Sequence, residues 1–98
     1  MKSKLQNRLE SGLSAITAEI MPPRGGNTAL ALGKAIKLKE IVHGFNVTDG
    51  SRAIMRMSSL ALCRLLLEAN LEPILQLSCR DRNRIALQAE LLLSLIHI

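Results

Sequence analysis

The sequence predicts an α/β fold in which parallel strands alternate with helices. Three apolar segments with strand character are each followed by a segment of helical periodicity. The starts of these strands recur roughly every 30 residues, which is the length of one βαβ step. Strands separated by helices pair in parallel through right-handed crossovers, so a barrel and a doubly wound sheet are the candidate architectures.

A short amphipathic helix is expected before the first strand. Leu5, Leu9 and Leu13 recur at a spacing of four, and Gly12 is typical of a helix end. The first strand is then predicted over residues 16–21, because its apolar positions alternate and the two prolines that follow cannot continue a central strand.

The first long helix is predicted over residues 27–40, with Asn27 or Thr28 as its N-cap. Its lysines lie away from the apolar positions, so one face is expected to pack against the sheet. That face consists of Leu32, Ala35 and Ile36.

The second strand is predicted over residues 43–48. Its helix is expected to start near Asp49 or Ser51 and to end near residue 69, with Arg64 and Glu68 as an i,i+4 ion pair. The inner face of this helix is expected to consist of Ile54, Met57, Ala61 and Leu65.

The third strand is predicted over residues 73–78, and a helix over residues 81–92 follows it. The apolar side of this helix is expected to be buried in the same way as in the first two units. The residues concerned are Ile85, Ala89 and Leu92.

Polar residues gather at the carboxyl ends of the predicted strands. Parallel strands put these ends on one rim, and both candidate architectures bind their ligands there. We therefore expect the side chains to lie together at a ligand-binding rim. They are Glu19 on the first strand, Asn46, Thr48 and Asp49 on the second, and Gln76, Ser78 and Arg80 on the third.

Glu19 is the first candidate for acid–base chemistry. Glutamate is almost never fully buried unless it is paired or functional, and this one lies in an apolar strand that runs into Pro22-Pro23 and Gly25-Gly26. The prolines hold the strand exit rigid at the end where α/β folds build their active sites. The alternative is a structural residue in a salt bridge.

Three short segments at these strand ends carry a family resemblance. They are Glu19-Ile20-Met21-Pro22-Pro23-Arg24-Gly25, Asn46-Val47-Thr48-Asp49 and Gln76-Leu77-Ser78-Cys79-Arg80-Asp81-Arg82-Asn83-Arg84. In this order and at this spacing they resemble the N-terminal part of methylenetetrahydrofolate reductase. The resemblance covers residues 1–92 and implies a (βα)8 TIM barrel of which only the first three strand–helix units are present.

The resemblance implies an FAD-dependent oxidoreductase that uses NAD(P)H to reduce 5,10-methylenetetrahydrofolate to 5-methyltetrahydrofolate. Glu19 matches the family's acid, which protonates the folate nitrogen so that the five-membered ring opens; this chemistry needs a partly desolvated carboxyl. Thr48 matches a residue that hydrogen-bonds the flavin. Gln76 stands where a better-known branch has histidine. The FAD-binding residues are thus expected to be Thr48, Gln76 and Arg80.

Two interpretations stay open for several of these residues. The arginines of residues 80–84 can bind flavin or nicotinamide phosphates, or the segment is a capped helix start with solvated charges. Asp49 is either a ligand contact or, more simply, a helix N-cap. The alternative function is a non-catalytic TIM-barrel subunit of a redox or pterin-binding complex. Glu19 together with Thr48 favours the enzyme, since a scaffold does not need a carboxyl at the rim.

The net charge and the cysteine content limit the classes of ligand and cofactor that we expect. The net charge of +5 suits anionic small molecules, and nucleic acid is not expected because Phe45 is the one aromatic residue available for stacking. Cys63 and Cys79 have no clustered histidines, so no metal is expected and both are predicted to be reduced thiols that pack as small hydrophobes. The apolar stretches fall short of the ~18 residues of a membrane span, and no secretory h-region is present, which favours a cytoplasmic protein away from membranes.

Residues 93–98 depart from the family, which continues with a fourth strand. The sequence Leu93-Ser94-Leu95-Ile96-His97-Ile98 resembles the translation of a transposon-end sequencing adaptor, so we expect read-through at the edge of a library fragment. Three strands cannot close a barrel. We therefore expect the 98-residue chain to be an inactive fragment of a full-length reductase. The resemblance implies that the full-length reductase is a homo-oligomer.

Overall fold

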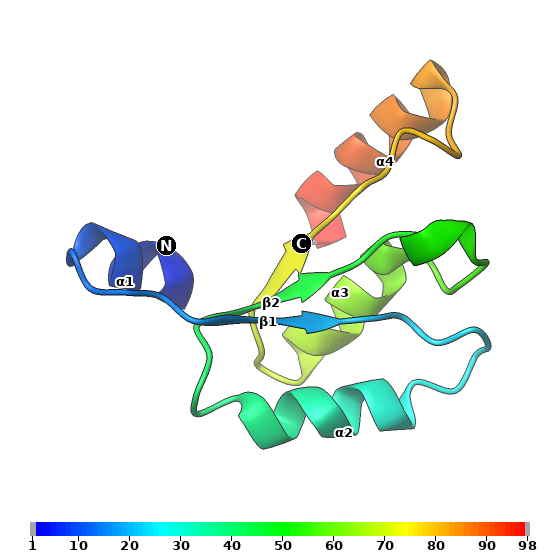
Figure 1. The fold of residues 1–98 in the computed structure, drawn as a ribbon. Coiled ribbons are helices and arrows are strands. Elements are labelled where there is room, and N and C mark those ends of the chain that lie inside the picture. The colour runs from blue at the N-terminus through cyan, green and yellow to red at the C-terminus, as the bar shows by residue number, and fades with distance from the viewer. Residues whose placement is uncertain (1, 98) are drawn as a thin grey trace.

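The computed structural model describes residues 2–97 and has the α/β architecture that the sequence predicts. Its strands form one sheet in the order β1-β2-β3, and both neighbouring pairs are parallel (Figure 1). Within the described residues β1 and β3 are edge strands, so this part of the chain forms an open sheet and not a closed barrel. In chain order the elements are α1 Lys4–Glu10, β1 Thr17–Ile20, α2 Ala29–Leu38, β2 Gly44–Val47, the 3-10 helix η1 Ser51–Ala53, α3 Ser59–Glu68, β3 Pro73–Leu75 and α4 Arg84–His97.

The two faces of the sheet have different surroundings. On β2, Phe45 and Val47 are buried against the helices, whereas Asn46 between them lies on the opposite, open face. The parallel register pairs Asn46 with Glu19 on β1. The open face of the sheet therefore carries polar side chains, and the covered face carries the core.

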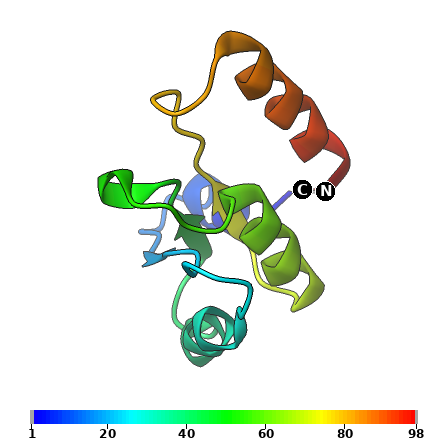
Figure 2. The same cartoon turned by 90° about the vertical axis from the view of Figure 1, so that its right-hand side faces the viewer.

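The core lies between the sheet and the helices α2 and α3, which cover the same face (Figures 1 and 2). Ala35 is fully buried and Leu32 packs against the core, as predicted. Ile36 is exposed, which corrects the prediction, because one residue along a helix turns the side chain by about 100° from the buried position of Ala35. The core cluster consists of Ile20, Ala31, Ala35, Val42, Phe45, Val47, Leu62, Cys63, Leu66 and Leu71.

The predicted helix start after β2 is wrong. The chain first forms η1 and then an extended stretch, and α3 begins only at Ser59. Gly50, Arg52 and Ala53 have φ values of +57°, +60° and +59°, which lie in the left-handed region and prevent a right-handed helix from starting there.

The late start of α3 also moves its buried face. Leu62, Cys63 and Leu66 face the core, whereas the predicted Ala61 is exposed. Ile54 and Met57 precede the helix and contribute no helical face, and Leu65 is half-buried. The predicted ion pair within this helix is confirmed, since Arg64 Nη2 lies 3.5 Å from Glu68 Oε1.

The helix α4 starts three residues later than predicted and continues through residues 93–97, whose proposed adaptor origin stays a prediction. Figures 1 and 2 show α4 rising away from the sheet, and its main contact with another helix or strand is with α3. The predicted burial of its apolar side is therefore wrong, because within residues 2–97 this side does not pack against the sheet. Ile85 is 70% exposed, Leu92 is 66% exposed, and Ala89 is exposed as well.

The predicted lead-in helix is confirmed as α1, which ends beside Gly12. Glu72, just before β3, holds the start of this helix. Its Oε1 accepts a hydrogen bond from the backbone N–H of Lys4 at 2.7 Å, and its Oε2 accepts one from that of Leu5 at 3.3 Å. Two of the three leucines of the predicted apolar face are nevertheless exposed, namely Leu9 and Leu13.

Candidate functional site

Three loops follow the carboxyl ends of the strands and are bonded to one another. The first two meet where the backbone N–H of Met57 donates to the carbonyl of Pro23 at 2.7 Å. The second and third meet where the backbone N–H of Ser78 donates to the carboxylate of Asp49 at 2.6 Å. The predicted rim is thus a connected surface with the second loop at its centre. The loops are β1–α2 (residues 21–28), β2–α3 (residues 48–58) and β3–α4 (residues 76–83).

Glu19 lies near the carboxyl end of β1, on the open face of the sheet. Its register partner is Asn46, whose side-chain amide donates to Thr17 Oγ1 at 3.1 Å. The Glu19 side chain is exposed, so the partly desolvated carboxyl that the sequence predicts is not found in residues 2–97. The reason is its place on the open face of the sheet, opposite the face that α2 and α3 cover.

Thr48 directly follows β2 and is only 7% exposed. Its backbone N–H donates to the carbonyl of Ile20 at 3.2 Å, which continues the β1–β2 ladder. Its Oγ1 is buried and has no hydrogen-bond partner among the described residues. Leaving a buried hydroxyl unbonded costs about 1–3 kcal/mol, so Thr48 stands out as a residue that a ligand can satisfy.

Gln76 follows β3 at the same level of the rim as Thr48. Val47 pairs with Leu75, so one further step along both strands brings Thr48 and Gln76 side by side. The backbone carbonyl of Gln76 accepts a hydrogen bond from Ser59 Oγ at 2.8 Å, and its side chain is exposed. The rim thus carries an amide beside the buried hydroxyl.

Arg80 lies further along the β3–α4 loop and is engaged within the protein. Its Nη2 donates to the carbonyl of Gly50 at 2.7 Å and to the carboxylate of Asp81 at 2.6 Å. Asn83 caps α4, because its Oδ1 accepts from the backbone N–H of Ala86 at 2.8 Å. The capped helix start is therefore confirmed, but its charges are not all solvated, since the Arg82 side chain is only 13% exposed. The phosphate contact of Arg80 stays a prediction.

Asp49 and Arg82 form a partly buried ion pair with side chains that are 11% and 13% exposed. Arg82 donates from both terminal nitrogens to the Asp49 carboxylate and from Nε to Glu90 on α4 at 2.6 Å. Burial alone would raise the pKa of Asp49, but the hydrogen bonds from Arg82 and from the Ser78 N–H hold the pKa below its ordinary value of 3.8. The predicted N-cap role of Asp49 is wrong, because its carboxylate serves this pair.

Sequence reasoning missed Arg56, which lies in the β2–α3 loop between two cavities. Its Nη1 donates to the carbonyl of Pro22 at 3.1 Å, and its Nε is buried without a partner in residues 2–97. One cavity, of about 420 Å³, is shared with Glu19 and Lys34. The other, of about 630 Å³, lies between the β2–α3 loop and the start of α4. The sequence predicts a helix across this loop, and an arginine on such a helix carries no sign of burial.

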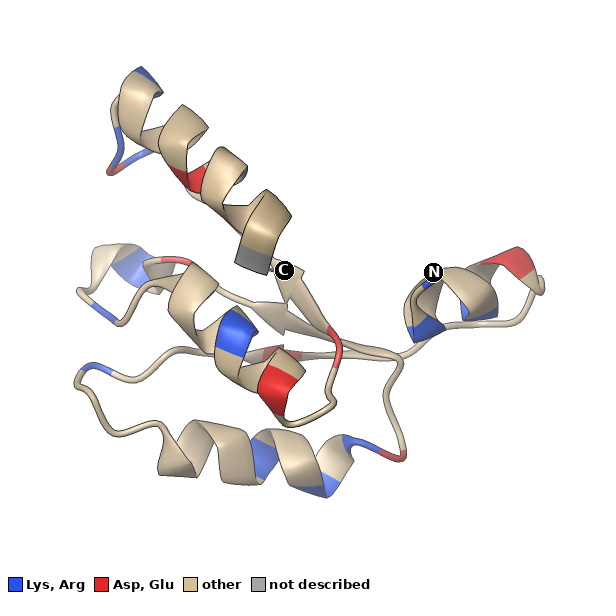
Figure 3. Cartoon of the chain, turned by 180° about the vertical axis from the view of Figure 1, so that it is seen from behind, with Lys and Arg blue, Asp and Glu red and all other residues tan. Residues whose placement is uncertain are grey.

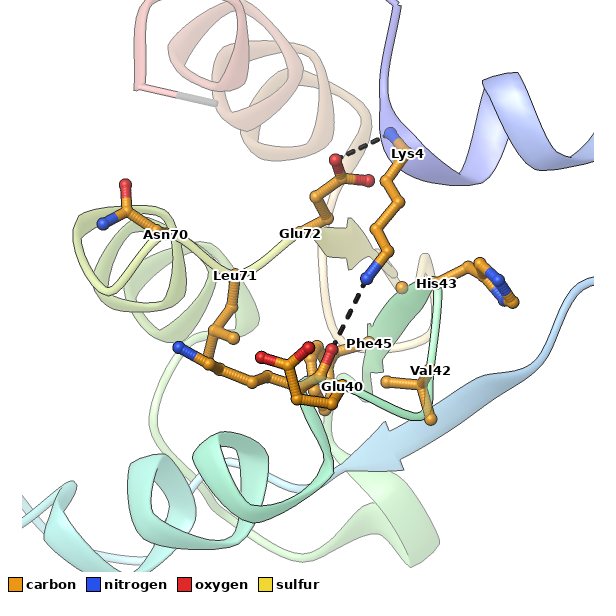
Figure 4. A pocket seen from close by; sticks show the side chains of 10 residues that line it. Lys4, Glu40, Val42, His43, Phe45, Asn70, Leu71 and Glu72 are labelled. Atoms are coloured by element: carbon orange, nitrogen blue, oxygen red, sulfur yellow. Dashed lines mark hydrogen bonds between the residues drawn. The ribbon is translucent and has the colours of Figure 1, made fainter.

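A further cavity, of about 240 Å³, lies at the opposite end of the sheet (Figure 4). Lys4, Glu72 and His43 are among the residues that line it. His43 Nδ1 accepts a hydrogen bond from the backbone N–H of Ile16 at 3.0 Å, which gives the histidine a structural partner away from the rim.

Basic and acidic residues are interspersed over the helices and loops (Figure 3).

The two cysteines differ in exposure. Cys63 lies in the core, and burial raises the pKa of its thiol to about 12. Cys79 lies in the β3–α4 loop and is exposed, so the prediction that both thiols are packed is right for Cys63 and wrong for Cys79.

In the part of the chain that the structure describes, no three acidic, histidine or cysteine side chains cluster as metal ligands. None of its helices combines the length and apolar character needed to cross a bilayer.

The fold and rim define a class of protein, namely parallel α/β proteins whose polar side chains gather at the carboxyl ends of the strands. The chain matches the methylenetetrahydrofolate reductase family over residues 4–94 of its 98 residues, and it belongs to that family. The resemblance drawn from the three rim segments is thereby confirmed, and the family is one of oxidoreductases of folate metabolism. Comparisons with curated proteins and with solved structures give no match.

Proposed function

We propose that the full-length protein reduces 5,10-methylenetetrahydrofolate to 5-methyltetrahydrofolate, with FAD as cofactor and NAD(P)H as electron donor. The observation that carries this proposal is the position of Glu19 in a chain of this family. The residue is a carboxylic acid on the open face of a parallel sheet, near the carboxyl end of its strand. In barrels built from such strands, this end carries the catalytic groups.

The residues at the rim fit a flavin. Thr48 Oγ1 is buried without a partner in residues 2–97, and a hydroxyl both donates and accepts, as the ring nitrogens and carbonyls of a flavin require. The amide of Gln76 beside it has the same dual character. Arg80 supplies a positive charge suited to phosphate, although it must leave Gly50 and Asp81 to reach one. FAD, when bound, supplies the hydride-transfer chemistry, and these three residues are proposed to hold it.

Glu19 is proposed to hold the proton that the folate nitrogen receives as the five-membered ring opens. A carboxyl delivers a proton most effectively when its pKa lies near the working pH, and removing water from around it raises the pKa in that direction. In residues 2–97 the side chain is exposed on the open face of the sheet. We therefore expect the rest of the barrel and the bound ligand to exclude water from Glu19.

The variant Glu19→Gln of the full-length protein tests this role. Amide and carboxyl have the same shape, but the amide cannot deliver the proton, so folate reduction should fall by about 10²–10⁴-fold. Reduction of FAD by NAD(P)H should persist. Glu40→Gln is the matched control, since Glu40 is exposed at the opposite end of the sheet. Unchanged folate turnover in Glu19→Gln would defeat the proposed role.

We further propose that residues 1–98 alone do not carry the activity. Both edge strands of the described sheet are unpaired, and a flavin that lies across a barrel rim needs the strands that close it. A purified 98-residue chain that holds FAD stoichiometrically and oxidises NAD(P)H would contradict this proposal.

A further inference from the structure

We propose that Arg56 and Lys34 form an oxyanion-binding site beside Glu19, which takes a carboxylate or phosphate group of a bound ligand. The inference deepens the proposed function and rests on it for the identity of that ligand. The site itself follows from the charge, burial and hydrogen bonding of residues in the β1–α2 loop, α2 and the β2–α3 loop.

The cavity that these residues share has a volume of about 420 Å³. Its charged lining residues within the described chain are Glu19, Lys34 and Arg56, so two positive charges and one negative charge leave a net charge of +1. The remaining lining residues are uncharged, among them Met21 and Leu30. A concave, partly apolar surface with a net positive charge concentrates anions.

The guanidinium of Arg56 is already held in place. Its Nη1 donates to the carbonyl of Pro22 at 3.1 Å, and the next residue, Met57, is bonded through its backbone N–H to Pro23 at 2.7 Å. Two loops therefore fix the side chain at its base and at one nitrogen. An anion that binds there has less rotational freedom to remove, which favours binding.

The second edge of this guanidinium, which Nε and Nη2 form, lacks hydrogen-bond partners within residues 2–97. Nε is buried with no hydrogen-bond partner in residues 2–97, and Nη2 likewise forms no hydrogen bond there. Nε and Nη2 together make the edge through which arginine binds a carboxylate or phosphate with two parallel hydrogen bonds. A buried N–H of a charged group that lacks a hydrogen-bond partner destabilises the protein. An oxyanion that accepts a hydrogen bond from this N–H removes that cost, which favours its binding.

Arg56 also differs from Arg80 and Arg82, the two rim arginines that form ion pairs. Arg80 is paired with Asp81, and Arg82 is paired with both Asp49 and Glu90. Arg56 forms no ion pair with the described residues, although it is only partly exposed. The counterion of Arg56 is therefore assigned to a ligand.

Two ligand groups share this chemistry, namely the glutamate carboxylates of a folate and the phosphates of FAD. Inorganic pyrophosphate and N-(4-aminobenzoyl)-L-glutamate are the probes that separate them, and isothermal titration calorimetry on the full-length protein measures both. We expect the wild-type protein to bind one of the two. Pyrophosphate binding that Arg56→Gln weakens assigns the site to the cofactor, and aminobenzoyl binding that Arg56→Gln weakens assigns it to the folate.

Arg56→Gln should weaken binding of that probe by at least about tenfold, since it removes a charged two-bond contact. Lys34→Gln is an exposed substitution that leaves the loops intact, and it should weaken binding by about threefold or more. Arg52→Gln is the matched control, because Arg52 is an exposed arginine of the same loop that lines neither rim cavity; its binding should equal that of the wild type.

The proposal is overturned if the wild-type protein binds neither probe, or if Lys34→Gln and folded Arg56→Gln both bind as tightly as the wild type. Should Arg56→Gln not fold, Arg56→Lys takes its place, since it keeps the charge but loses the two-bond edge and should weaken binding measurably. Neither probe undergoes reduction, so these results stand whether or not Glu19→Gln abolishes folate turnover.

Discussion

The carboxylate of Asp49 and the guanidinium of Arg82 join two rim loops across 33 positions of sequence. The same guanidinium also donates to the carbonyl of Ser78 at 2.7 Å, and the Ser78 N–H donates back to Asp49 at 2.6 Å. This closed set of bonds fixes the exit of β3 against the exit of β2. It therefore sets the spacing between the Gln76 and Thr48 segments of the proposed flavin site.

Replacing Asp49 with Asn should destabilise the folded protein by about 2 kcal/mol, because it removes charge-assisted hydrogen bonds from a partly buried pair, while Arg82 keeps its ion pair with Glu90. Chemical denaturation of the full-length protein measures the change in unfolding free energy. Glu68→Gln is the control, since it breaks the exposed Arg64–Glu68 pair and should cost about 0.5 kcal/mol or less. Equal effects of the two substitutions would show that the partly buried Asp49–Arg82 pair contributes no more to stability than an exposed one.

The same pair predicts a pH dependence. The pKa of Asp49 is lower in the folded protein than its ordinary value of 3.8, so its contribution to stability is fully present above that value. The contribution is lost as the pH falls below 3.8 through the folded-state pKa. The difference in unfolding free energy between the wild type and Asp49→Asn should therefore shrink below pH 3.8, and a difference that stays constant down to acid pH would contradict the assignment.

Ala53→Gly should stabilise the protein by about 0.5–1 kcal/mol. Ala53 has a φ of +59°, which costs a residue with a Cβ about 1–2 kcal/mol, and the gain from relieving this strain exceeds the entropy that glycine adds to the unfolded chain. Ala61→Gly is the control, since Ala61 is exposed in the right-handed helix α3 and should lose about 0.5–1 kcal/mol. Thermal unfolding of both variants gives the comparison, and a loss of stability in Ala53→Gly would contradict the assigned strain.

The strands and their parallel order were predictable from the sequence, because apolar segments such as the one that contains Phe45 and Val47 indicate buried strands directly. The start of α3 could not be predicted from the sequence. Arg52 and Ala53 adopt left-handed backbone angles that neither residue type favours, so their conformation depends on the surrounding loop contacts. Periodicity likewise indicates the apolar side of α4 at Ile85, but it carries no information on which element covers that side.

The candidate site was predictable where a residue type at a strand end has a known chemistry, as for Glu19. The flavin contact of Thr48 was predicted from the family resemblance alone. The burial of its hydroxyl, and the lack of a hydrogen-bond partner in residues 2–97, can be seen only in the structure. The pairing of Arg82 and the position of Arg56 depend on contacts between loops that lie far apart in the sequence. Such contacts leave no local pattern, which is why the charge run around Arg82 gave two equal interpretations.

Removal of the Thr48 hydroxyl should raise the stability of the protein but weaken its binding of the cofactor. Thr48→Val removes a buried oxygen that has no partner in residues 2–97, so the protein without FAD should gain about 1 kcal/mol or more of unfolding free energy. The same change removes the hydrogen bond proposed for the flavin, so the Kd for FAD should rise by about tenfold. Denaturation without FAD and a fluorescence titration with FAD measure the two effects.

Thr48→Ser separates the hydroxyl from the methyl group of the same side chain. Serine keeps the donor and acceptor, so FAD affinity should stay near that of the wild type, whereas loss of a buried methyl group should lower stability by about 1 kcal/mol. The two variants should therefore move stability in opposite directions, and only valine should weaken FAD binding. If valine destabilises the protein without FAD, the hydroxyl has a partner in the full-length fold, and its assignment to the flavin fails.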